Sequence, residues 1–105
     1  MIRINVKYQK NNINHITILG HANYDNYGKD IVCAAVSATY LCTVNGILKI
    51  DKDSISIINN DSKQEIVVNK NSDVILSLLQ NMVECFVDLE RQYPNNIKLD
   101  LDKEE

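Results

Sequence analysis

The chain has little glycine, proline or cysteine and no tryptophan: its 105 residues include three glycines, one proline and three cysteines. So little glycine and proline excludes collagen-like and low-complexity disordered proteins. Three cysteines cannot all pair within one chain, which argues against a disulfide framework and favours a reduced, cytoplasmic protein. Two histidines and the absence of a C-x-x-C pair give no metal-site pattern. We therefore expect no metal and no other cofactor.

Long hydrophobic runs and an excess of positive charge are also missing. A membrane span needs about 18 apolar residues or more, and polar residues interrupt the richest stretch, residues 31–48. The N-terminal sequence MIRINVKYQKNN lacks the apolar segment of a secretory signal. The net charge of −3 disfavours a broad nucleic-acid-binding surface. We expect neither a membrane nor direct nucleic acid among the partners.

Hydrophobic periodicity predicts seven secondary-structure elements in a single domain over residues 1–105. Alternation of apolar and polar residues, or short β-branched runs, predict strands at 2–8, 13–19, 54–58, 64–68 and 97–101. Apolar residues at helical spacing predict one helix from Asp30 to residue 48 and another between residue 72 and Pro94. The order ββαββαβ predicts an α+β fold, with two helices packed on a mostly antiparallel sheet.

The first predicted helix is apolar on both faces. One face carries Ile31, Ala34, Ala35, Ala38, Cys42 and Asn45, and the opposite face carries Cys33, Ser37, Tyr40, Val44 and Ile47. A helix that is apolar all round is buried on more than one side. One sheet in a small domain covers only one side, so a second copy of the chain is the simplest cover for the other.

Asp30 and Cys33 indicate how this helix begins. If Asp30 is the N-cap residue, its carboxylate accepts a hydrogen bond from the Cys33 backbone N–H. The Cys33 sulfur then lies in the first turn, where the positive end of the helix dipole favours a thiolate, the reactive form of cysteine.

His21 directly follows the second predicted strand and Gly20, a residue that permits close backbone approach or unusual dihedral angles. If the polar loop after Gly20 folds back, His21 lies beside Cys33. An imidazolium stabilises a thiolate and protonates a leaving amine, so this pair would suffice for a cysteine hydrolase. The group that orients His21 stays open among Asp25, Asp30 and a backbone carbonyl.

The same residue types also have a purely structural interpretation. A histidine and a cysteine twelve residues apart occur often by chance, and most buried cysteines are inert. Cys42 and Cys85 occupy apolar helix positions, so we interpret them as packing residues. His15 lies in mid-strand and is interpreted as a residue of the sheet surface.

One continuous block of 18 residues carries a recognisable motif. It reads G-H-A (20–22), Tyr24, Gly28, Lys29 and D-I-V-C-A-A-V-S (30–37). At this separation the block resembles the signature of the ribosomal-processing cysteine protease family Prp. The rest of the chain also resembles this family, because it has an amphipathic second helix that ends in Tyr93-Pro94 and then a final strand.

The resemblance implies a homodimeric cysteine endopeptidase. Such proteases remove a short N-terminal extension from large-subunit ribosomal protein twenty-seven and cut after a pair of aromatic residues. The family dyad matches His21 and Cys33. The segment from His21 to Lys29 would order around substrate, with Gly28 as a hinge.

The remaining residues of the block are expected to shape the site. Asp30 matches the family block and is assigned to helix capping and site geometry, and Ser37, one turn after Cys33, is expected to line the pocket. Tyr24, Tyr27 and Tyr40 are candidate walls of an apolar groove for aromatic substrate residues. Backbone N–H groups at the helix start would stabilise the oxyanion.

Two other functions compete with the protease. One is a non-catalytic module that binds a ribosomal protein or an assembly intermediate, with Cys33 as a structural residue. The other is a thiol-based redox or acyl-transfer protein, which the absence of a C-x-x-C pair disfavours.

Overall fold

A computed structural model describes residues 1–20 and 27–103, and for residues 27–30 it describes the backbone alone. The described elements are β1 (Ile2–Gln9), β2 (Asn12–Leu19), α1 (Tyr27–Ile50), β3 (Ile55–Asn60), β4 (Lys63–Val68), α2 (Asp73–Gln92) and β5 (Ile97–Lys103). This is the predicted ββαββαβ order, and the α+β class is confirmed.

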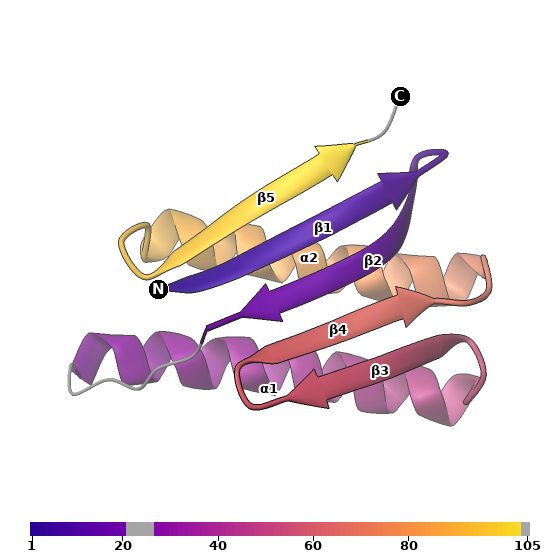
Figure 1. The fold of residues 1–105 in the computed structure, drawn as a ribbon, viewed down its shortest axis with the longest axis horizontal. Coiled ribbons are helices and arrows are strands. Elements are labelled where there is room, and N and C mark those ends of the chain that lie inside the picture. Colours follow the sequence, from indigo (N-terminus) through magenta and orange to yellow (C-terminus); the bar gives the residue numbers. More distant parts are fainter. Residues whose placement is uncertain (21–26, 104–105) are drawn as a thin grey trace.

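The five strands form one sheet in the order β3-β4-β2-β1-β5. Three neighbouring pairs are antiparallel, including both predicted hairpins, and β1 pairs with β5 in parallel. The first hairpin turns through Lys10 and Asn11, both with positive φ, which fits a tight two-residue turn. Both helices lie behind the sheet and cover the same face of it (Figure 1).

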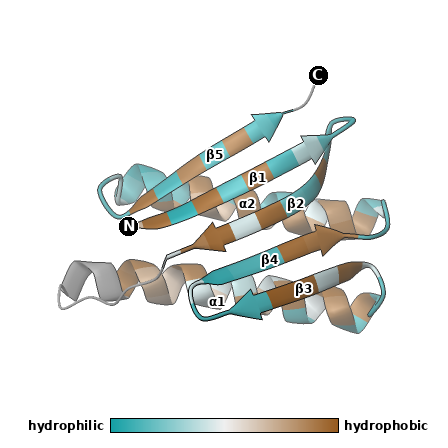
Figure 2. Ribbon diagram, in the orientation of Figure 1, coloured by the Kyte–Doolittle hydropathy of each residue, from teal (hydrophilic) through white to brown (hydrophobic). Residues whose placement is uncertain are grey.

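The core lies between this face and the helices, because period-two alternation sends one set of side chains inward. Ile4 and Val6 of β1 are buried together with Ile16 of β2 and Ile66 of β4. The alternation is visible as brown and teal bands along β1 (Figure 2). The opposite face of the sheet carries polar side chains, among them His15 and Glu65, whose Nε2 and Oε1 atoms are 2.9 Å apart.

The start of α1 corrects one expectation. The helix begins at Tyr27, so Asp30 lies inside it and is not the N-cap residue. Aspartate is favourable throughout the first turn as well as at the cap, so its place in the sequence did not fix the boundary. Cys33 is consequently in the second turn. The helix-dipole effect falls off within the first turn, so it does not supply the thiolate stabilisation that the sequence suggested.

The length and composition of α1 correct a second expectation. The segment Ile31–Ile50 is long and apolar enough to cross a membrane by those criteria alone, despite its polar interruptions. The core helix of a soluble protein meets the same criteria. Here one face of α1 packs into the core, with five buried side chains: Val32, Val36, Tyr40, Val44 and Ile47.

Candidate active site

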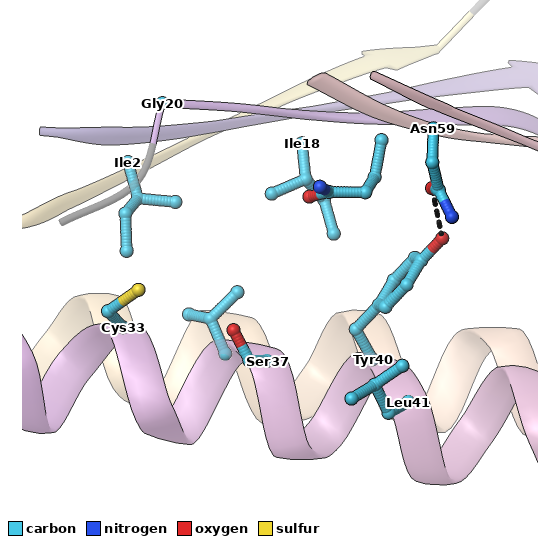
Figure 3. Close-up of a pocket in the computed structure, with 10 residues that line it drawn as sticks. Ile2, Ile18, Gly20, Cys33, Ser37, Tyr40, Leu41 and Asn59 are labelled. Atoms are coloured by element: carbon cyan, nitrogen blue, oxygen red, sulfur yellow. Dashed lines mark hydrogen bonds between the residues drawn. The ribbon is translucent and has the colours of Figure 1, made fainter. Parts of the chain in front are cut away.

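A pocket of about 190 Å³ lies between α1 and the helix-facing side of the sheet (Figure 3). The strands and the residue after β2 contribute Ile2, Ile18, Gly20, Asn59 and Gln64. The helix contributes Cys33, Val36, Ser37, Tyr40 and Leu41. The pocket therefore joins the block identified in the sequence to strand residues far away along the chain.

Cys33 lies at one end of this pocket, and its sulfur is directed toward the strands (Figure 3). The side chain is half-buried, packs against the core and takes part in no disulfide. Ser37, one turn later, also lines the pocket, as expected. A free thiol at the end of an apolar pocket is placed to attack a group bound there.

Gly20 lies opposite Cys33, and its position can be filled only by glycine without strain. Its φ of +78° is in the region that favours glycine, and an added Cβ would lie 2.7 Å from the backbone oxygen of Met1. Its N–H donates a hydrogen bond of 3.0 Å to the backbone oxygen of Ser62. The expected close approach and unusual dihedral angle are confirmed. They fix the direction in which the chain leaves β2.

The structure brings together only part of the predicted site. Gly20, Cys33, Ser37 and Tyr40 share the pocket. His21 and Tyr24, with the Asp25 alternative, lie outside the described residues. The backbone of Tyr27 and Gly28 is helical, so the end of the predicted loop belongs to α1, whereas the expected roles of these two residues stay predictions. Asp30 does not cap the helix, and its role in the geometry of the site stays a prediction.

Tyr40 forms a buried wall of the pocket, as the sequence suggested. Its side chain is 6% exposed, and its hydroxyl donates a 3.3 Å hydrogen bond to Oδ1 of Asn59. Burial raises the pKa of Tyr40 above its ordinary value, so the phenol remains a hydrogen-bond donor at neutral pH. The hydroxyl thereby holds the Asn59 carboxamide at the pocket end away from Cys33 (Figure 3).

The sequence interpretation missed the strand residues of the pocket. Ile18 pairs with Gln64, and Gln64 pairs with Asn59, so the three lie in one row across β2, β4 and β3. A signal was available for two of them. Gln64 precedes buried Ile66 by two residues, and Asn59 follows Ile57 by two, so period two places both polar side chains on the helix-facing side.

The described part of the site offers the Cys33 thiol as a nucleophile and a largely apolar pocket. Within residues 1–20 and 31–103, no three His, Cys, Asp or Glu side chains are grouped so as to hold a metal ion. The described half of the site therefore fits thiol chemistry on an extended, largely apolar ligand.

Comparison with known proteins assigns this geometry to a family. A family model described as "Cysteine protease Prp" matches residues 1–98. The chain belongs to the cysteine protease Prp family. A curated Prp relative from Staphylococcus aureus, named ribosomal processing cysteine protease Prp, is 34% identical over 83 residues, which are 76% of this chain and 78% of the relative. The family resemblance seen in the sequence is confirmed, and the chain is a cysteine protease by family.

Solved Prp structures match the whole fold. A crystal structure of S. aureus Prp in complex with a substrate peptide has a TM-score of 0.88 and 28% identity, and covers 97% of this chain and 100% of that one. A second, with a covalently linked product peptide, has a TM-score of 0.86 and 29% identity over the same shares. A Streptococcus mutans structure, with a TM-score of 0.88 and 21% identity, covers 99% of this chain and 96% of its own and shares the fold.

Proposed function

We propose that this Prp-family protease removes the short N-terminal extension of large-subunit ribosomal protein twenty-seven by cutting after a pair of aromatic residues. Cys33 is the nucleophile, and His21 is its acid–base partner. The observation that carries the proposal is the Cys33 sulfur at the end of an apolar pocket. The S. aureus relative supports it, because that protein is named as a ribosomal processing protease and has been solved with substrate and covalently linked product peptides.

The proposed reaction proceeds through a thioester. The Cys33 thiolate attacks the carbonyl carbon of the second aromatic residue, and the carbonyl oxygen becomes an oxyanion. The C–N bond then breaks, and His21 gives its proton to the leaving amine of the mature protein. Neutral His21 next removes a proton from water, which attacks the thioester and releases the extension and the Cys33 thiolate.

The pocket and the charge of the chain suit this substrate. Apolar side chains from Ile2, Ile18, Val36 and Leu41 line the pocket, where aromatic residues would be desolvated. The net charge of −3 would steer the encounter with a basic ribosomal protein.

A second copy of the chain is part of the proposal. The side of α1 away from the sheet exposes Ile31, Ala34, Ala38 and Cys42, which form an apolar face without a covering element among the described residues. The exposed Leu41 lies at the edge of this face and also borders the pocket. We propose a homodimer in the cytoplasm that covers this face and acts without a membrane or direct nucleic-acid contact.

Intact-mass spectrometry of ribosomal protein twenty-seven carrying its extension tests the function. We expect the native enzyme to reduce its mass by that of the extension up to and including the aromatic pair. Cys33→Ala should bind the substrate and leave it whole, and His21→Ala should lose most of its turnover. Cys85→Ala, on α2 and outside the pocket, is the matched control and should cut normally.

Other outcomes select the alternatives. An uncut substrate that co-purifies with the native enzyme would favour the binding module and return Cys33 to a structural role. Alkylation of Cys33 without any cleavage would favour thiol redox or acyl-transfer chemistry. Cleavage at another site would contradict recognition of the aromatic pair.

A further inference from the structure

A second pocket lies at the end of β2 opposite to Gly20. Its volume is about 330 Å³. It lies between the β1–β2 turn and the connection from β4 to α2, which are at the same end of the molecule (Figure 1). Five carboxamides and one ammonium group line it, from Gln9, Asn12, Asn14, Asn69, Asn71 and Lys10. We call it the carboxamide pocket, and it shares no lining residue with the pocket of Cys33.

The carboxamide pocket exists because β2 and β4 diverge. Their pairing begins at His15, so the earlier residues of β2 have no partner on β4. The register between β1 and β2 shifts at the same point and leaves Asn14 as the extra residue of a β-bulge. After β4, the N–H groups of Asn69 and Lys70 donate to the Ser54 oxygen, which draws the chain away from β2 toward β3. Bulges of this kind are over-represented beside functional sites.

Most of the polar groups in this pocket have no partner among the described residues. Asn69 is the exception, because its Nδ2 atom donates to Oγ of Ser56 over 2.8 Å and to the backbone oxygen of Asp53. The other four carboxamides and the Lys10 ammonium make no side-chain hydrogen bond or ion pair with another described residue. No described carboxylate lines the pocket. Several N–H donors and one cation around the same space suit an oxygen-rich anion.

Lys10 has a backbone conformation that lysine rarely adopts. Its φ is 53° and that of Asn11 is 69°, so both lie in the left-handed region. A two-residue hairpin turn of this kind favours asparagine or glycine at these positions. A lysine in such a position is a local exception to turn preference, and exceptions of this kind are concentrated at functional sites.

We propose that the carboxamide pocket binds a phosphate monoester of a small polyhydroxylated molecule, such as a sugar phosphate. The Lys10 ammonium would pair with the phosphate oxygens through charge-assisted hydrogen bonds. The carboxamides would bond to the hydroxyl groups, because an amide and a hydroxyl each donate and accept. A volume of about 330 Å³ is more than a bare phosphate needs and is ordinary for a small-molecule site. The proposal is independent of the protease function.

Ribose 5-phosphate is the probe, and ribose and inorganic phosphate represent its two halves. Proton–nitrogen NMR spectra resolve the side-chain NH₂ signals of asparagine and glutamine, so a titration reports contact at these groups directly. We expect a Kd of about 1 mM, which about 14 non-hydrogen atoms give at ordinary ligand efficiency. The largest shifts should occur at Asn12, Asn14 and Asn71, and Asn59 and Gln64 should not shift. Ribose and phosphate should each bind at least about tenfold more weakly.

Three variants separate binding from folding. Lys10→Asn removes the ammonium and introduces a residue that the turn favours, so it should keep or raise the melting temperature while raising the Kd by about tenfold. Asn14→Leu should weaken ribose 5-phosphate by about threefold and leave inorganic phosphate unchanged. Lys52→Asn, an exposed turn lysine outside the pocket, is the matched control and should bind normally.

Three results would overturn the proposal. Equal affinity for inorganic phosphate and ribose 5-phosphate, with shifts near many lysines, would mean an adventitious ion only. An equal Kd in the native protein and in Lys10→Asn would mean that the ammonium does not hold the phosphate. Unchanged spectra at about ten times the expected Kd would mean that the pocket takes no ligand of this class.

Discussion

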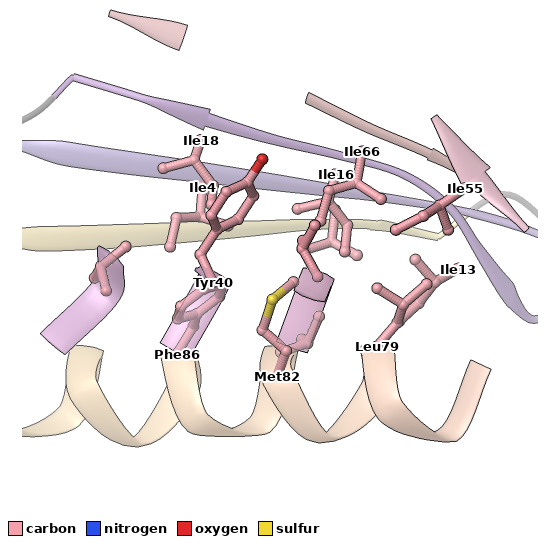
Figure 4. Packing of buried hydrophobic residues seen from close by; sticks show 14 of the residues in the cluster. Ile4, Ile13, Ile16, Ile18, Tyr40, Ile55, Ile66, Leu79, Met82 and Phe86 are labelled. Atoms are coloured by element: carbon pink, nitrogen blue, oxygen red, sulfur yellow. The ribbon is translucent and has the colours of Figure 1, made fainter. Parts of the chain in front are cut away.

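The two helices pack on the same side of the sheet but divide their surfaces differently. In α2, the buried side chains Ile75, Leu79, Met82, Val83 and Phe86 form one stripe. Figure 4 shows Leu79, Met82 and Phe86 directed from α2 toward the strands. In α1 the buried stripe is matched by an exposed apolar face, on which Ile31 is 48% and Leu41 is 53% exposed.

This difference separates structural from functional roles. The apolar stripe of α2 is buried within one chain, and Val74 is the one large apolar residue of this helix that is exposed. The apolar residues of α1 exceed what the sheet covers, and the same helix carries Cys33 and one wall of the pocket. A helix that serves the core, a site and the proposed interface needs more apolar positions than one that serves the core alone.

The largest expected effect is a loss of stability from a substitution in α2, the helix that serves the core alone. Phe86 is fully buried, so Phe86→Ala should lower the free energy of unfolding by about 3–5 kcal/mol through lost burial and a cavity. Urea unfolding measures it, and Asn81→Ala at an exposed position of the same helix is the control. A loss below about 1 kcal/mol would mean that α2 does not anchor the core as described.

Gly20→Ala changes the wall that faces α1 across the pocket. The added Cβ meets the Met1 backbone oxygen at 2.7 Å in a strained φ region, so we expect a loss of about 1–3 kcal/mol. Because the strain displaces the chain at the pocket, cleavage should fall by more than the folded fraction does. Unfolding curves and kcat/KM on one peptide measure both, and equal losses would contradict the positioning role.

Ala38→Arg tests the exposed face of α1. In a two-fold dimer the two new charges would be desolvated close to each other, so the dimer Kd should rise by about tenfold or more, roughly 1.4 kcal/mol. Analytical ultracentrifugation measures the association. Asn81→Arg on the exposed side of α2 should leave it unchanged, and a native protein that sediments as a monomer would refute the homodimer.

The smallest expected effect concerns the sheet face away from both helices. The hydrogen bond from His15, together with Lys63, lowers the pKa of Glu65 below its usual value. Because the pKa of Glu65 is lower in the folded state, its ionised form stabilises the protein at every pH above the ordinary glutamate pKa. This stabilisation is lost as the pH falls through the pKa of Glu65 in the folded state. The melting-temperature advantage over Glu65→Gln should therefore shrink below about pH 4.5, and a constant difference from pH 7 to pH 3 would contradict it.

Most of the architecture was predictable because its signals are local. The alternation of apolar and polar residues predicted the strands, and the apolar stripe of α2 predicted the length of that helix and the face that it buries. The start of α1 was misplaced because Asp30 fits either the cap or the first turn. The parallel pairing of β5 with β1 could not be read from the chain, because no local pattern records which strand neighbours which.

The residues of the site also fall into those with a local signal and those that depend on long-range pairing. Ser37 was predictable from its position one helical turn after Cys33, and the need for glycine at position 20 from its place after a strand. Asn59 and Gln64 were missed because they reach the pocket through cross-strand register, a long-range property. Their polarity at core-facing positions was the available signal.

The pairing of β1 with β5 also has a consequence for when the enzyme becomes active. Ile2 lines the pocket, and its backbone N–H donates a 2.9 Å bond to the Asn96 oxygen just before the final strand. During synthesis Asn96 emerges from the ribosome after every described residue that lines the pocket, so the Ile2 wall is fixed only once the chain has been made beyond α2. A nascent chain therefore lacks a finished pocket until β5 has been synthesised and paired with β1.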